Sequence, residues 1–139
     1  MQPKIYFIAL LLCFANICFT QNTQSLVGTW KIISQKVTRG DSTSVSDLKT
    51  YEALKVVSPT HVSYLSVSKV DSSTLAFVAR ITADKDVYTE QFEHTSAKEM
   101  MGLKATFKYK IDNDKWSIKG GLTLNNVVYV FDEIWQKVN

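Results

Sequence analysis

Polar and apolar residues alternate along most of the chain beyond residue 25. Between residues 103 and 112, one parity is polar and rich in lysine, and the other is apolar throughout: Leu103, Ala105, Phe107, Tyr109 and Ile111. Alternation with a period of two is typical of a β-strand with one buried face. No stretch sustains a helical apolar stripe beyond about two turns. The pattern therefore predicts a chain built from strands.

Eight such stretches follow one another, most of them separated by short connections rich in turn residues. Short connections make strands that are neighbours in sequence pair in space, as an antiparallel meander. A flat meander would leave two unpaired edges, and closing the sheet removes both. The sequence therefore predicts an all-β fold, a single eight-stranded antiparallel meander β-barrel. Its strands are expected at 26–37, 53–57, 61–68, 75–83, 87–95, 103–112, 115–123 and 127–138.

Two longer connections are expected to be loops. Residues 39–50 are polar, and a Gly-Asp turn should follow the first strand there. Residues 96–102 include Met100 and Met101 and should form a loop at the rim of the barrel.

Lysines assign the inward face of the strands, because an ionised lysine is almost never fully buried. In the strand 87–95, one parity holds Tyr88, Glu90, Phe92 and His94. If the aromatics face inward, Glu90 and His94 do so too. A buried carboxylate costs several kcal/mol unless it is paired or hydrogen-bonded. Glu90 therefore either fixes the strand register through a lysine, tyrosine or water network, or serves as the polar anchor of a ligand pocket.

The same rule orients the first strand. Trp30, Ile32 and Ser34 are expected to face inward, whereas Lys31 and Gln35 are expected to face outward. In the last strand each face mixes polar and apolar residues: one parity holds Glu133, Trp135 and Lys137, and the other holds Ile134, Gln136 and Val138.

The first twenty residues have a different character. Lys4 precedes a mostly apolar run that ends in polar residues. A positive end, a short apolar centre and a polar exit are typical of a secretory signal peptide, and a membrane-spanning helix would need about 20 apolar residues. We therefore expect a signal peptide over 1–20, cleaved near Thr20 or Gln21, and a secreted or periplasmic protein whose single domain covers 21–139.

Composition narrows the chemistry of the mature chain. Cys13 and Cys18 both lie in the expected signal peptide, so we expect neither disulfides nor thiolate chemistry. Loss of Lys4 lowers the formal net charge from +3 to +2. The remaining lysines are interspersed with acidic residues and form no basic cluster, so the sequence does not indicate nucleic-acid binding.

Few catalytic constellations are available. For a metal, residues 21–139 offer only His61 and His94, without close spacing, so no metal site and no cofactor are expected, and haem would have to bind through His94 alone. No nucleophile-elbow or phosphate-binding glycine motif is present. An enzyme would have to use a carboxylate pair, Glu90 and Glu133, as acid and base.

Four stretches carry a family resemblance through their order and separation: Leu26-Val27-Gly28-Thr29-Trp30-Lys31, Ser58-Pro59-Thr60-His61-Val62-Ser63-Tyr64, Tyr88-Thr89-Glu90 and Glu133-Ile134-Trp135-Gln136-Lys137. Over nearly the whole mature chain the sequence resembles the calycin superfamily, and more narrowly the secreted lipocalin-like proteins of Bacteroidetes-type bacteria. The resemblance implies structural roles for Gly28, Trp30, Trp135 and Lys137. Trp30 would plug one end of the barrel beneath Lys137, a position where the family prefers arginine.

An aromatic inward face with a carboxylate on it predicts a pocket rather than a plain apolar core. We expect the barrel to bind one small, largely apolar or amphipathic ligand, with Glu90 as its polar anchor. The alternatives are a carboxylate-dependent hydrolase or isomerase that uses Glu90 and Glu133, and a structural envelope domain with a filled barrel. No nucleic-acid partner and no membrane span in the mature chain are expected. The candidate ligand-binding residues are Tyr64, Phe77, Tyr88, Glu90, Phe92, His94, Phe107, Tyr109 and Trp116.

Overall fold

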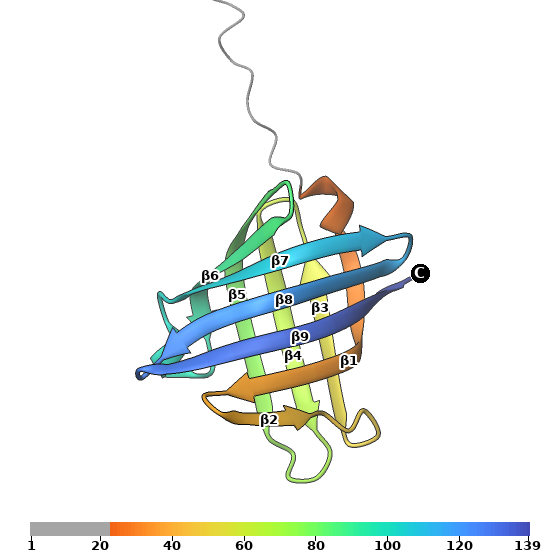
Figure 1. The fold of residues 1–139 in the computed structure, drawn as a ribbon. Coiled ribbons are helices and arrows are strands. Elements are labelled where there is room, and N and C mark those ends of the chain that lie inside the picture. The colour runs from red at the N-terminus through yellow and green to blue at the C-terminus, as the bar shows by residue number, and fades with distance from the viewer. Residues whose placement is uncertain (1–22) are drawn as a thin grey trace, which may run out of the picture.

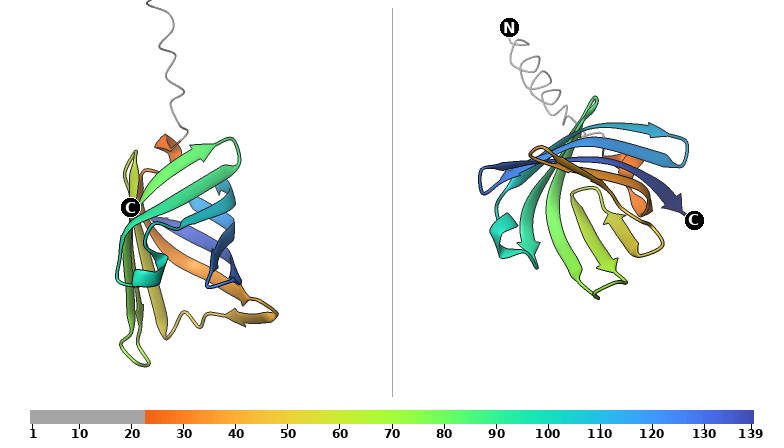
Figure 2. Two further views of the ribbon diagram at one scale, coloured as in Figure 1. Left: turned by 90° about the vertical axis from the view of Figure 1, so that its left-hand side faces the viewer. Right: turned by 60° about the horizontal axis from the view of Figure 1, so that its bottom comes forward.

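The computed structural model describes residues 23–139, which form a closed antiparallel β-barrel of eight strands with one additional strand (Figures 1 and 2). The last strand pairs with the first over most of its length, so the sheet closes on itself as the meander predicts. The eight-stranded fold is thereby confirmed. The expected signal peptide, with its two cysteines, lies outside the described residues.

The barrel strands follow the chain order, and most of them are connected by short turns. The 3-10 turn η2 (Gln24–Leu26) precedes the first strand, and a second 3-10 turn, η3 (Lys98–Met100), lies in the longer connection over residues 96–103. The strands are β1 (Gly28–Arg39), β3 (Tyr51–Val57), β4 (His61–Ser68), β5 (Thr74–Asp84), β6 (Val87–Thr95), β7 (Lys104–Asp112), β8 (Lys115–Leu124) and β9 (Val127–Val138). The additional strand is β2 (Ser42–Val45).

Strand β2 replaces part of the loop expected over residues 39–50. The chain turns at Gly40, whose φ of +55° suits glycine, and β2 then pairs back along the end of β1 (Figure 1). All four residues of β2 are exposed, and three of them are Ser or Thr. The strand therefore has no buried face and no apolar alternation from which it could be predicted.

A β-bulge at Ile33 reverses the alternation of β1. Ile32 pairs with Trp135 and Ser34 pairs with the preceding residue of β9, so Ile33 has no partner and is exposed. Trp30 and Ile32 face inward as expected, but Ser34 is exposed. The expectation for Ser34 and Gln35 is therefore wrong, because the extra residue turns Gln35 into the barrel.

A second bulge, at Glu93, does the same in β6. Phe92 pairs with Ala79, and His94 pairs with Val78, which leaves Glu93 between them without a partner in the ladder. Phe92 is buried, whereas His94 is exposed on the outer surface. The expectation that His94 faces the interior is therefore wrong, since a strict period of two does not continue past Glu93.

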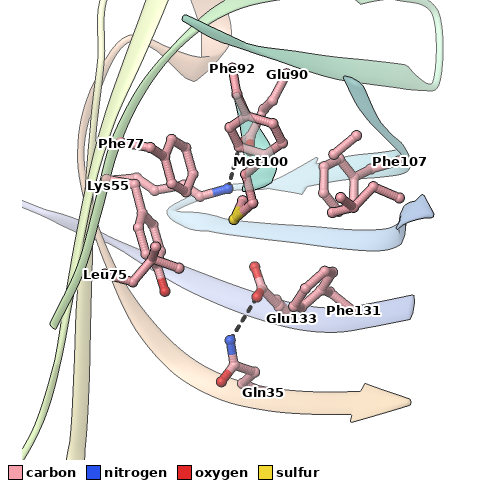
Figure 3. A pocket seen from close by; sticks show the side chains of 13 residues that line it. Gln35, Lys55, Leu75, Phe77, Glu90, Phe92, Met100, Phe107, Phe131 and Glu133 are labelled. Carbon is pink, nitrogen blue, oxygen red and sulfur yellow. Dashed lines mark hydrogen bonds and ion pairs between the residues drawn. The ribbon is translucent and has the colours of Figure 1, made fainter. Parts of the chain in front are cut away.

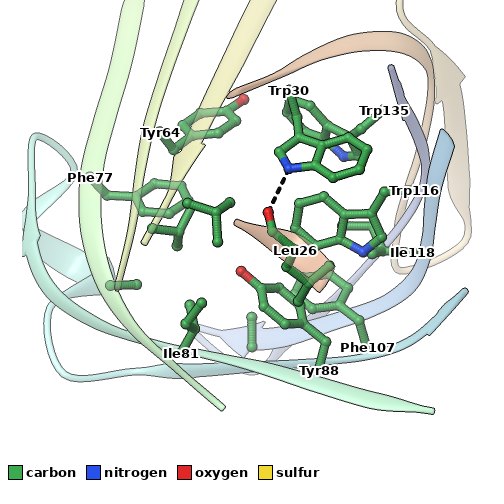
Figure 4. Packing of buried hydrophobic residues seen from close by; sticks show 14 of the residues in the cluster. Leu26, Trp30, Tyr64, Phe77, Ile81, Tyr88, Phe107, Trp116, Ile118 and Trp135 are labelled. Carbon is green, nitrogen blue, oxygen red and sulfur yellow. Dashed lines mark hydrogen bonds between the residues drawn. The ribbon is translucent and has the colours of Figure 1, made fainter. Parts of the chain in front are cut away.

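One end of the barrel is filled by large aromatic side chains (Figure 4). Trp30 is fully buried, its indole Nε1 donates to the carbonyl oxygen of Leu26 over 2.7 Å, and its ring meets that of Trp116 edge-on at 5.5 Å. The ammonium of Lys137 lies 5.4 Å from the centre of the Trp30 ring. A Cβ atom at Gly28 would lie 2.9 Å from Lys137 Cε, so glycine leaves the room that this lysine occupies.

Removing the Trp30 ring should test this packing. Trp30→Ala is expected to lower the free energy of unfolding by about 3–5 kcal/mol, since it empties a fully buried aromatic site. Lys137→Ala should cost about 1 kcal/mol or less, because only a partly exposed cation–π contact is lost. Urea unfolding of the three proteins measures both values. An unchanged stability of Trp30→Ala would contradict the assignment of Trp30 as the plug.

Candidate ligand-binding site

The other end of the barrel contains a cavity of about 70 Å³ that is partly open to solvent (Figure 3). Four half-buried apolar side chains form its rim, aromatic rings form its walls, and four polar side chains reach it from β1, β3, β6 and β9. The rim residues are Leu75, Met100, Leu122 and Phe131; the walls are Tyr64, Phe77, Phe92, Ala105 and Phe107; the polar residues are Gln35, Lys55, Glu90 and Glu133.

The structure brings five of the nine candidate ligand-binding residues to this cavity: Tyr64, Phe77, Glu90, Phe92 and Phe107. Tyr88 and Trp116 face inward but belong to the filled end, where their rings pack edge-on at 5.1 Å. Tyr109 is half-buried at 6.3 Å from the Tyr88 ring, and His94 lies outside the barrel. Alternation separates inward from outward residues, but it does not tell how far along the barrel axis an inward residue lies.

A buried ion pair joins opposite parts of the wall. Lys55 Nζ of β3 lies 2.6 Å from Glu90 Oε1 of β6, and only 3% of each side chain is exposed. The Tyr88 hydroxyl donates to the same oxygen over 2.9 Å. The ammonium also lies 5.0 Å from the Trp135 ring centre and 5.2 Å from that of Trp116, within cation–π range. Burial and the Glu90 charge raise the pKa of Tyr88 well above its ordinary value, so the phenol remains a donor.

Lys55, like Gln35, is a polar residue of the cavity that the sequence did not predict. The rule that lysines face outward places it on the surface, but Ala53, Lys55 and Val57 are buried while Leu54 and Val56 are about half exposed. The signal that points to Lys55 is indirect. A carboxylate at an inward position requires a cationic or hydrogen-bonding partner, and Lys55 shares its parity in the strand with the apolar residues Ala53 and Val57.

Glu133 is held at the cavity by a second polar network. Gln35 Nε2 donates to Glu133 Oε1 over 2.8 Å, and Trp135 Nε1 donates to Glu133 Oε2 over 2.9 Å. The hydroxyl of Ser46 donates to Gln35 Oε1 over 2.6 Å and so fixes the orientation of the amide. Burial raises the pKa of Glu133 above its ordinary value, while the nearby Lys55 charge and the two donors act against this rise.

Breaking the ion pair should be costly because it strands a buried charge. Lys55→Met is expected to lower the free energy of unfolding by about 3–5 kcal/mol. The double variant Lys55→Met/Glu90→Gln should recover more than half of that loss, since neither side of the pair then carries a charge and the introduced amide oxygen still accepts from Tyr88. The matched surface control is Lys69→Met, which removes a half-exposed 2.6 Å pair with Glu52 and should cost about 1 kcal/mol or less.

Urea unfolding of these variants gives the three values. Equal losses for Lys55→Met and Lys69→Met, or no recovery in the double variant, would contradict the buried pair.

The raised pKa of Glu133 predicts that the stability of the fold depends on pH. Because its pKa is raised on folding, its contribution to stability is fully present below the unfolded value of 4.5 and is lost as the pH rises through the folded pKa. The free energy of unfolding of the wild type, relative to Glu133→Gln, should therefore fall as the pH rises above about 4.5. Urea titrations at several pH values measure this difference. A difference that is constant or rises with pH would show that the carboxyl is not destabilised by burial.

Comparison with known proteins does not assign this site. Neither the protein-family models nor the curated proteins with which the chain was compared match it. Within residues 23–139, no group of three or more His, Cys, Asp and Glu side chains is placed to hold a metal ion. That part of the chain also contains no helix long and apolar enough to cross a membrane. A function has to be argued from the cavity itself.

Proposed function

We propose that the barrel binds one small, largely apolar molecule at its open end. The observation that carries this proposal is the division of the interior: one end is filled by tryptophans, and the other holds a solvent-accessible cavity with aromatic walls and buried polar groups. Binding sites for small molecules combine mostly apolar walls with a few placed polar groups. Phe77, Phe92 and Phe107 would contact the apolar part of the ligand, and Glu133 and the Lys55–Glu90 pair would contact its polar part.

The size of the cavity limits the ligand. About 70 Å³ is well below the roughly 300–1,000 Å³ that surround a drug-sized molecule. The ligand is therefore a compound of one ring or a short chain, or it extends out through the open end. Met100 at the rim has a flexible side chain that can move aside for a larger occupant.

Two other functions were compatible with the sequence, and the interior favours binding over both. A barrel filled by its own side chains describes the end around Trp30 but not the end with the cavity. An enzyme with a carboxylate pair is favoured by the position of Glu90 and Glu133 at one cavity. However, Glu90 Oε1 already accepts from Lys55 and Tyr88, so proton transfer through this oxygen would first have to break the ion pair. Binding needs no such step.

We also propose that the protein is exported and that its signal peptide is removed. The pattern of residues 1–20 supports export, and the four lipocalin-like stretches support a place among secreted lipocalin-like proteins. The mass of the protein recovered from its native cells tests this step. Loss of the residues before Thr20 or Gln21 is expected, and an intact residue 1 would contradict it.

A cavity-filling variant tests binding. Benzyl alcohol, a one-ring probe, should raise the melting temperature of the wild type by a few degrees at saturation, because it binds only the folded state. Leu122→Trp should abolish the rise, since the larger side chain fills the rim. Leu65→Trp makes the same change at an exposed position on the outer face of β4 and should leave the rise intact. Failure of benzyl alcohol and of a panel of other small apolar compounds to shift the wild type would favour the filled barrel instead.

A further inference from the structure

The charges around the cavity do not balance. Of the cavity-lining residues that the structure describes, Lys55 carries a positive charge, whereas Glu90 and Glu133 are both carboxylic acids. Lys55 is committed to Glu90 at 2.6 Å, and no ion pair within residues 23–139 involves Glu133. The cavity therefore lacks one positive charge if Glu133 is ionised.

Glu133 can also accept more hydrogen bonds than the two it receives from the protein. Each of its oxygens accepts one hydrogen bond, from Gln35 and from Trp135, while a carboxylate offers about four acceptor positions. Its carboxylate points into the middle of the cavity (Figure 3). A donor that enters from the open end would find an oriented acceptor whose position is fixed from behind.

We propose that the ligand is a small apolar amine, whose ammonium group pairs with Glu133 while its hydrocarbon part lies against the phenylalanine walls. This inference rests on the proposed function and names the class of ligand. A cation is suited to this cavity in two ways: it restores the charge balance at Glu133, and Phe77, Phe92 and Phe107 present rings to which a cation is attracted.

An anionic ligand fits the same cavity poorly. It would add a third negative group beside Glu90 and Glu133, and it would have to take Lys55 away from the carboxylate that already holds it. A neutral alcohol can donate to Glu133 but leaves the charge uncompensated. The order of affinity should therefore be amine, alcohol, carboxylate.

Binding of an amine should release a proton. Burial raises the pKa of Glu133, and the ammonium favours its ionised form. The charged groups that face Glu133 are Lys55 of β3 and Glu90 of β6. The phenols of Tyr64 and Tyr88 also lie near, and burial raises the pKa of both, so they remain protonated. Affinity for an amine should consequently rise with pH until Glu133 is fully ionised.

The test uses three probes of one shape, benzylamine, benzyl alcohol and benzoate, titrated calorimetrically into the wild type at neutral pH. Benzylamine should bind about tenfold or more tightly than benzyl alcohol, because both probes can donate to Glu133 but only the ammonium also compensates its charge. Repeating the amine titration at about pH 5, where a carboxyl group of raised pKa is still largely protonated, in buffers of different ionisation enthalpy should reveal proton release, and this readout needs no variant. In Glu133→Gln the advantage of the amine should disappear while benzyl alcohol still binds.

Glu133→Gln should keep the fold. The Gln35 amide can rotate to accept from the new side-chain amide, the Ser46 hydroxyl then accepts from Gln35 Nε2 instead of donating to Gln35 Oε1, and Trp135 still donates to the new amide oxygen. Glu52→Gln, the same change on the outer face, is the matched control and should retain the preference for the amine. If benzyl alcohol binds but benzylamine does not bind more tightly, or if benzoate binds best, the amine inference is overturned and the proposed function stands. If none of the three probes binds, the amine inference is overturned. The proposed function fails as well if the wider panel of small apolar compounds also leaves the melting temperature unchanged.

Discussion

The buried pair of Lys55 and Glu90 is the interaction on which the interior of this barrel depends. Its ammonium lies against the tryptophan rings of the filled end and also reaches the cavity of the open end, so the pair stands at the boundary between them. Two charges in such a place are stable only together, because either one alone would remain desolvated without a partner. The pair thus connects β3 and β6 and keeps polar groups within reach of the cavity.

Two single-residue bulges determine which side chains of β1 and β6 face the cavity. The bulge at Ile33 turns Gln35 into the barrel, where it binds Glu133, and the bulge at Glu93 turns His94 out of it. Without the first bulge, Glu133 would lose one of the two donors that orient it. Bulges are often found where a strand has to redirect a side chain toward a site. In this barrel one bulge brings Gln35 to the polar wall of the cavity, and the other keeps His94 out of the interior.

The fold was predictable from the sequence because it follows from alternation and short turns. The inward positions of Phe77, Phe92 and Phe107 were predictable for the same reason. The bulges were not, since neither Ile33 nor Glu93 is a glycine or stands beside one. Lys55 was hidden because its burial depends on Glu90, a partner 35 positions away in the chain. Strand β2 was hidden because main-chain pairing, rather than an apolar face, holds it on β1.

The central proposal is that the open end of this barrel binds a small molecule. Native mass spectrometry of the protein purified from the cells that produce it, without added ligand, tests this claim most directly. The account predicts an additional mass on the wild type, belonging to a small basic compound and absent from Leu122→Trp purified in the same way. A wild-type protein that carries no additional mass, and that still carries none after incubation with an extract of small molecules from the same cells, would contradict it.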